Sequence, residues 1–194
     1  MKKRLKITLN APLVLGFALA CTVVTLICMV AGDAARIAFS TYRASLSDPM
    51  TYVRLFTHVL GHNGWQHLAG NMAYILLLGP ILEEKYGWKN LLAVILVTAA
   101  ITGIIHNLLF PRTMLLGASG VVFAMILLTS FTDFREGEIP LTFILVAAIY
   151  LGQQIWQGVT EQDNISQLTH ILGGLVGGVA GYLLNREKKN IRRY

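Results

Sequence analysis

The chain has 194 residues, of which 55% are hydrophobic and 13% are charged, about half the charged fraction of a typical soluble domain. Nine of the sixteen Lys and Arg residues lie within residues 1–10 or 186–194, so most of the net charge of +6 belongs to two tails. Basic tails beside apolar segments fit an anionic membrane surface better than nucleic acid. The composition therefore indicates an integral membrane protein whose partner is the lipid bilayer, with no nucleic-acid partner.

Six apolar segments follow one another along the chain, and each approaches the roughly 20 residues that a spanning helix needs. They are residues 11–32, 66–82, 90–110, 114–132, 140–157 and 168–185. We therefore predict an all-α membrane protein of six transmembrane helices. One membrane domain, residues 11–185, lies between cytoplasmic basic tails at residues 1–10 and 186–194. The basic tails place both termini in the cytoplasm, which requires an even number of spans.

The first long loop, residues 33–65, is the part of the chain that fits this predicted topology least well. It contains Arg36, Arg43 and Arg54, although the topology places it outside. It also contains Pro49 and Trp65, which suit a folded loop that is partly embedded in the membrane.

Three chemically capable side chains are predicted to lie at one depth. Ser119 lies fourteen residues before Asp133, whereas His170 and His67 each lie sixteen residues before the next cytoplasmic charge. At about 1.5 Å per residue these separations are roughly 21 and 24 Å. All three residues then lie in the outer part of the membrane, on spans four, six and two.

Ser119 stands in the segment Gly117-Ala118-Ser119-Gly120. Its hydroxyl becomes a nucleophile only when a base removes its proton, and His170 is the candidate base. Glycines at this position also favour close helix packing, so a small-residue contact without chemistry remains an alternative. His170 opens a glycine-rich span, which could equally be a packing helix with an interfacial histidine.

His67 and Asn71 are four residues apart and therefore share one face of span two. Both side chains can donate hydrogen bonds to an oxyanion, although a polar clasp between helices is the alternative. His58 and His62 are also four apart, but Val59 occupies the position where a metalloprotease motif needs glutamate, so we predict no metal. His106 is predicted at the membrane interface. The expected spans contain no Asp or Glu, which argues against an aspartyl protease and a carboxylate proton relay.

Three motifs together resemble the rhomboid intramembrane serine proteases. They are Gly117-Ala118-Ser119-Gly120, the series His58, His62, His67 and Asn71, and His170-x-x-Gly173-x-x-x-Gly177. The resemblance covers all six predicted spans. It implies a Ser119–His170 dyad, with His67, Asn71 and the backbone N–H of Ser119 as the oxyanion hole, and no cofactor.

The same resemblance implies supporting roles for further residues. Arg54 would hold the first outer loop at the membrane interface, and Glu84 would tie helices together at the inner end of span two. Gly173 would let span six approach the serine. Phe123 stands where bacterial rhomboids commonly have tyrosine, and its ring is expected to stack on the catalytic histidine.

The function that this resemblance implies is cleavage of transmembrane protein substrates near the outer face of a membrane, most simply a prokaryotic inner membrane. Such substrates should contain helix-breaking residues, and Ile155 and Trp156 of span five are candidate gate residues. A catalytically silent relative that binds transmembrane clients is the alternative. A small transporter is a weaker one, because the inner halves of spans two, four and six are almost wholly apolar. The sequence does not predict an oligomeric state.

Overall fold

The computed structural model describes residues 8–132, 141–142, 144–149, 152 and 164–191. Within these residues the chain is helical, and the β-type pairing there is an isolated bridge between Thr41 and Leu115. The helices are α1 (Pro12–Ala31), α2 (Asp33–Ala38), α3 (Pro49–Thr57), α4 (Trp65–Tyr86), α5 (Trp88–Leu109), α6 (Ser119–Thr129) and α8 (Asn164–Ile191). The predicted all-α class is confirmed for this part of the chain.

Among the described residues, three helical segments are long and apolar enough to cross a membrane: Pro12–Ala31, Trp88–Leu109 and Gln167–Asn185. The six spans and the positions of the termini stay predictions, because half of the segment predicted as span five, including Ile155 and Trp156, lies outside the described residues. Span four begins later than expected, since α6 starts only at Ser119. The last helix runs on to Ile191, into the segment predicted as a tail.

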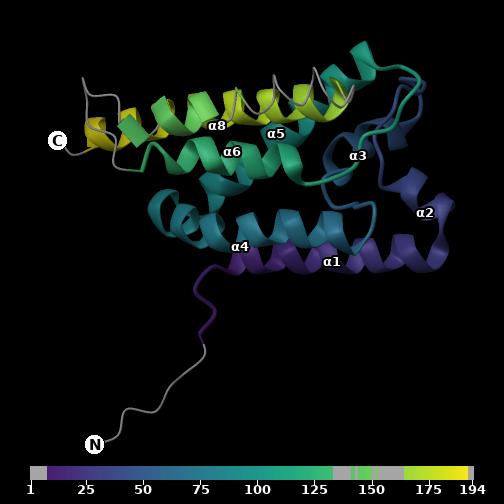
Figure 1. Ribbon diagram of the computed structural model, residues 1–194, viewed down its shortest axis with the longest axis horizontal. Coiled ribbons are helices and arrows are strands. Elements are labelled where there is room, and N and C mark those ends of the chain that lie inside the picture. Colours follow the sequence, from purple (N-terminus) through teal and green to yellow (C-terminus); the bar gives the residue numbers. More distant parts are fainter. Residues whose placement is uncertain (1–7, 133–140, 143, 150–151, 153–163, 192–194) are drawn as a thin grey trace, which may run out of the picture.

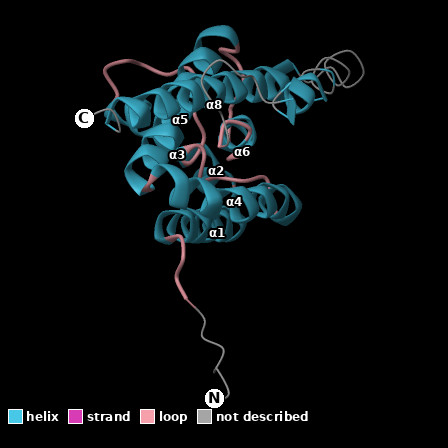
Figure 2. Ribbon diagram, turned by 90° about the vertical axis from the view of Figure 1, so that its left-hand side faces the viewer, coloured by secondary structure: helices cyan, strands magenta, loops and turns pink. Residues whose placement is uncertain are grey.

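The long helices run roughly along one direction, and the short helices α2 and α3 gather at one end of the bundle (Figure 1). The view turned by 90° shows α6 between the α1–α4 pair and the helices α5 and α8 (Figure 2). Side chains of α6 are accordingly buried along most of its length, from Val121 to Leu128. The helix that begins at Ser119 is therefore the central element of the fold.

At the opposite end from α2 and α3, α4 passes directly into α5. Gly87 forms this turn with a φ of +83°, a backbone conformation that glycine adopts without steric cost. Asn185 of α8 donates to the Tyr86 hydroxyl at 3.0 Å and to the Phe131 carbonyl at 3.0 Å. Lys85 also donates to the carbonyl of Thr132. These bonds tie the ends of α4, α6 and α8 together.

Glu83 connects α1 to α4. The cap residue of α1, Ala11, offers no side-chain hydrogen bond to the free N–H groups of the first turn. The Glu83 carboxylate supplies the missing acceptors, taking the N–H of Leu13 at 3.1 Å and that of Val14 at 3.0 Å. Its negative charge also lies at the positive end of the α1 dipole. The helix tie that the resemblance assigned to Glu84 is thus made by its buried neighbour, whereas Glu84 is exposed.

Candidate active site

The loop before α6 is fixed by the histidine-bearing segment between α3 and α4. Gly117 N–H donates to the backbone carbonyl of His58 at 2.9 Å, and Ala118 N–H donates to Nε2 of His62 at 3.4 Å. Gly117 has a φ of +133°, and a Cβ there would lie 2.8 Å from Cε1 of His67. Glycine is required at this position both by the backbone conformation and by the neighbouring ring.

His62 is held in one tautomer by these contacts. Because Nε2 accepts the bond from Ala118, Nδ1 carries the proton of the neutral ring, and it lies 3.1 Å from the Leu60 carbonyl. Thr25 of α1 lies 3.4 Å from the same nitrogen. Burial and the adjacent His67 ring lower the pKa of His62 to about 4, although the Leu60 carbonyl opposes the shift. A neutral ring can accept from Ala118, and a protonated ring cannot.

The support of the loop before α6 by His58 and His62 was not predicted from the sequence. Their spacing drew attention to metal binding, whereas the contacts are with backbone groups of residues 117 and 118. The signal that could have revealed this role is that the N–H groups of the glycine-containing turn at residues 117 and 118 need acceptors. The two histidines supply them, through one backbone carbonyl and one ring nitrogen.

Helix α8 approaches α6 so closely that side chains would not fit between them. A Cβ on Gly173 would lie 2.1 Å from the Gly120 carbonyl oxygen, and one on Gly177 would lie 2.0 Å from that of Ala124. Both neighbours are backbone atoms, which cannot rotate away. The predicted role of Gly173 in letting the last helix approach α6 near Gly120 agrees with this geometry, and Gly177 acts in the same way one turn further on.

The close approach brings His170 to the α6 helix. Its ring lies 4.3 Å from the Phe123 ring, measured between centroids, with an interplanar angle of 41°. The ring contact expected for phenylalanine in place of tyrosine is therefore present. Phe123 lies one helical turn after Ser119, so this contact holds the imidazole on the serine face of α6.

One cavity of about 550 Å³ collects the polar residues singled out in the sequence. It lies between α4, α6 and α8, and its lining includes Ser119, His170, His67 and Asn71. Leu115, Val122, Ile126 and other apolar side chains make up much of the rest. Three helices thus place Ser119, His170 and His67, which were predicted to lie at one depth, around the same cavity as Asn71.

Asn71 is buried in this cavity wall, and its Nδ2 atom has no hydrogen-bond partner among the residues that the structure describes. A buried donor without a partner costs free energy, so such a group calls for an explanation, and a catalytic role is one. His67 lies beside it on the same face of α4, with its ring 5.0 Å from that of His62 in an edge-to-face arrangement. The side chains of Asn71 and His67 both line the cavity that Ser119 also lines.

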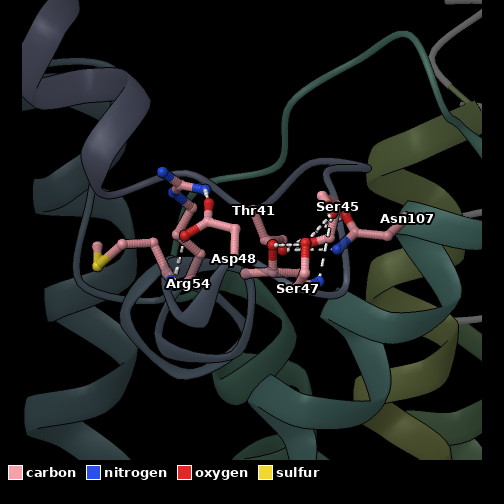
Figure 3. A network of polar contacts seen from close by, with 8 residues as sticks. Thr41, Ser45, Ser47, Asp48, Arg54 and Asn107 are labelled. Carbon is pink, nitrogen blue, oxygen red and sulfur yellow. Dashed lines mark hydrogen bonds and ion pairs between the residues drawn. The ribbon is translucent and has the colours of Figure 1, made fainter.

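Arg54 stabilises the first loop. It forms an ion pair with Asp48 at 3.4 Å, and its guanidinium lies 4.8 Å from the centre of the Tyr42 ring. Figure 3 shows Arg54 against Asp48, close to the contact between Thr41 and Asn107 of α5. Asp48 also caps α3 by accepting the N–H of Met50. Arg54 therefore organises the loop from within, and its role in holding the loop at the membrane interface stays a prediction.

His106 lies near the end of α5, the helix that corresponds to predicted span three. The side chain is only 2% exposed, and its Nε2 lies 3.3 Å from the Thr113 carbonyl oxygen. It lies at the end of α5, under the loop that leads to the serine. The turn at residues 110–113, which closes over the helix end, accounts for this burial.

The apolar helices and the polar cavity between them define an α-helical integral membrane protein. A profile of the Rhomboid domain matches residues 49–187, which is most of the chain. The chain belongs to the Rhomboid family.

Individual relatives agree with this assignment. The chain is 28% identical to rhomboid protease GlpG of Haemophilus influenzae, covering 71% of this chain and 72% of that protein. It is 27% identical to the chloroplastic Rhomboid-like protein 11 of Arabidopsis thaliana, covering 70% of this chain and 53% of that protein. It is 28% identical to rhomboid protease GluP of Bacillus subtilis, covering 73% of this chain and 28% of that protein. The chain spans about half the length of the Arabidopsis relative.

Proposed function

We propose that the protein is an intramembrane serine endopeptidase that cleaves transmembrane segments through Ser119 and His170. The observation that carries this proposal is that both residues line the same cavity, together with His67 and Asn71. Two of the named relatives, GlpG and GluP, are called rhomboid proteases, which supports the same chemistry.

In the proposed reaction His170 removes the proton from the Ser119 hydroxyl as the oxygen attacks the substrate carbonyl carbon. The carbonyl oxygen becomes an oxyanion, which accepts hydrogen bonds from Asn71 Nδ2, His67 and the Ser119 N–H at the start of α6. His170 then gives its proton to the leaving amine, and the peptide bond breaks. Water hydrolyses the acyl-enzyme by the same steps and restores the serine.

The free Nδ2 of Asn71 supports the assignment of an oxyanion site. In the ground state this donor has no partner among the described residues, so it needs no rearrangement when negative charge develops above Ser119. Donors that are already in place stabilise a transition state more than donors that must first leave another partner.

The proposed substrates are membrane proteins with a transmembrane segment. The cavity wall includes Tyr74 of α4 on one side and Val146 and Ile149 on the other, so a substrate could reach Ser119 between these elements. An intact helix shields its backbone carbonyls, so cleavable segments should contain helix-breaking residues near the cut. The basic tails support placement in a prokaryotic cytoplasmic membrane with both termini inside.

The test uses the purified full-length chain in vesicles with a model single-span substrate. Ser119→Ala and His170→Ala should each abolish cleavage. Ser130→Ala is a matched control, because Ser130 caps the end of the same helix and its hydroxyl donates to the Ile126 carbonyl. Cleavage by both active-site variants at the wild-type rate would refute the dyad. Binding of the substrate by the wild-type protein without any cleavage would favour a silent client-binding relative instead.

A further inference from the structure

A second hollow lies away from the proposed active site, between α5 and α8. It has a volume of about 590 Å³, within the range of small-molecule sites in proteins. Its walls are apolar except for Asn90 at one end. The mechanism proposed above uses none of its residues, so the groove needs an explanation of its own.

The lining of the groove extends along both helices. On α5 it follows one helix face from Asn90 to Ile101, and on α8 it runs from Leu172 to Leu184. Eleven helical steps correspond to about 16 Å, close to the hydrocarbon depth of one leaflet, which is half of about 30 Å. Small side chains at Ala93 and Ala180 form part of the wall, where larger residues would fill the space.

The two ends of the groove differ in charge. The Tyr86 hydroxyl bonds to Asn185, which places the start of α5 beside the last turns of α8. At this end Lys89 is exposed, and its Nζ lies 5.6 Å from the centre of the Trp88 ring. Beyond Asn185 the α8 helix continues to Ile191. This stretch of sequence has three basic residues, Arg186, Lys188 and Lys189, and one acidic residue, Glu187. An exposed tryptophan beside a lysine is typical of the headgroup level of a membrane.

We propose that this groove binds one acyl chain of an anionic phospholipid, with its phosphate beside Lys89. The apolar groove matches a chain of one leaflet in length, and the positive end matches the negative headgroup. Basic sites between transmembrane helices are a known means of selecting anionic lipids. Such a lipid would fill the space between α5 and the helix that carries His170.

The test measures lipid retention, so it does not depend on proteolysis. The full-length protein in detergent is given phosphatidylglycerol or phosphatidylcholine with identical acyl chains, and native mass spectrometry counts the lipids that remain bound. Wild-type protein should retain one phosphatidylglycerol in clear preference to phosphatidylcholine. Lys89→Gln should weaken that preference about fivefold, the contribution of one basic residue at a membrane surface. Inorganic phosphate alone should not compete.

Ala180→Trp should fill the groove and abolish retention of either lipid, and Ala93→Leu is a milder variant if the first one does not fold. Matched controls are Val23→Trp on the exposed face of α1 and Arg112→Gln in the exposed loop after α5. Equal retention of the two lipids by wild type would overturn the proposal. A bound phosphatidylglycerol that survives both groove-filling variants would overturn it as well.

Discussion

Asn71 and Asn107 illustrate how the same residue type serves different purposes in this fold. The Asn71 amide nitrogen is buried without a partner in the described part of the chain, whereas Asn107 donates to the Thr41 hydroxyl at 2.9 Å. The first arrangement leaves a donor available to a reacting oxygen. The second one fastens the loop before α3 to α5.

Asn71→Ala should therefore lower kcat by about 10²–10³-fold, the usual effect of losing one oxyanion donor. Its stability should change by about 1 kcal/mol or less, because no protein partner of Nδ2 is left unsatisfied. Asn107→Ala should show the reverse, a lower melting temperature with a smaller effect on kcat. Unchanged kcat in Asn71→Ala would contradict its role as an oxyanion donor.

His62 gives the site a dependence on pH. It lies in the loop between α3 and α4, outside the spanning helices, and burial lowers its pKa from 6.5 to about 4. The unfolded chain therefore takes up a proton at higher pH than the folded chain does. The stabilising contribution is fully present above pH 6.5 and is lost as the pH falls through 4.

The melting temperature of the wild-type protein should accordingly fall between pH 6.5 and pH 4. His62→Asn removes the titrating ring, so its melting temperature should change less over this interval, even if it is lower throughout. Thermal melts at matched ionic strength measure both slopes. Equal slopes in the two proteins would show that His62 does not titrate as described.

The α6–α8 contact determines where His170 lies. Gly177→Ala would place a Cβ against the Ala124 carbonyl oxygen, and backbone atoms can relieve this overlap only if the helices separate. We expect a loss of about 1–3 kcal/mol in stability, as for other overpacked sites, together with a loss of activity. Gly178→Ala is the matched control, because nothing lies within 4 Å of its Cβ position. A Gly177→Ala protein as stable and active as Gly178→Ala would contradict the close packing.

Two variants test whether Glu83, and not the adjacent Glu84, caps α1. Glu83→Gln should lower stability by about 1–2 kcal/mol, because a neutral amide replaces the charged acceptor of two backbone N–H groups. Glu84→Gln should change it by about 0.5 kcal/mol or less, as is usual at exposed sites. Thermal melting compares the two. An equal loss in both variants would mean that Glu83 has no special role.

Over the whole molecule, the grouping of Ser119, His67 and His170 around one cavity agrees with what the sequence predicted. Because the rise per residue is constant, Ser119, His67 and His170 could be assigned one level before any contact was known. The glycine spacing in the last helix likewise indicated close packing near Gly120. These predictions rest on local regularity, which a single sequence records directly.

Tertiary contacts account for what the sequence did not predict. The late start of α6 depends on bonds from residues 117 and 118 to His58 and His62, which are more than fifty residues away. Glu83 and Glu84 are adjacent carboxylates, and only the position of α1 distinguishes them. The first loop was predicted to be folded, but its contacts among Arg54, Asp48 and Tyr42 are side-chain contacts that helical periodicity does not record.

Labelling of the serine tests the central claim most directly. The full-length protein is treated with a fluorophosphonate, and the modified residue is identified by peptide mass spectrometry. We predict a single adduct on Ser119, which disappears in His170→Ala although Ser119 is still present, because the hydroxyl then has no base. Labelling of His170→Ala at the wild-type rate, or an adduct on another residue in place of Ser119, would contradict the account.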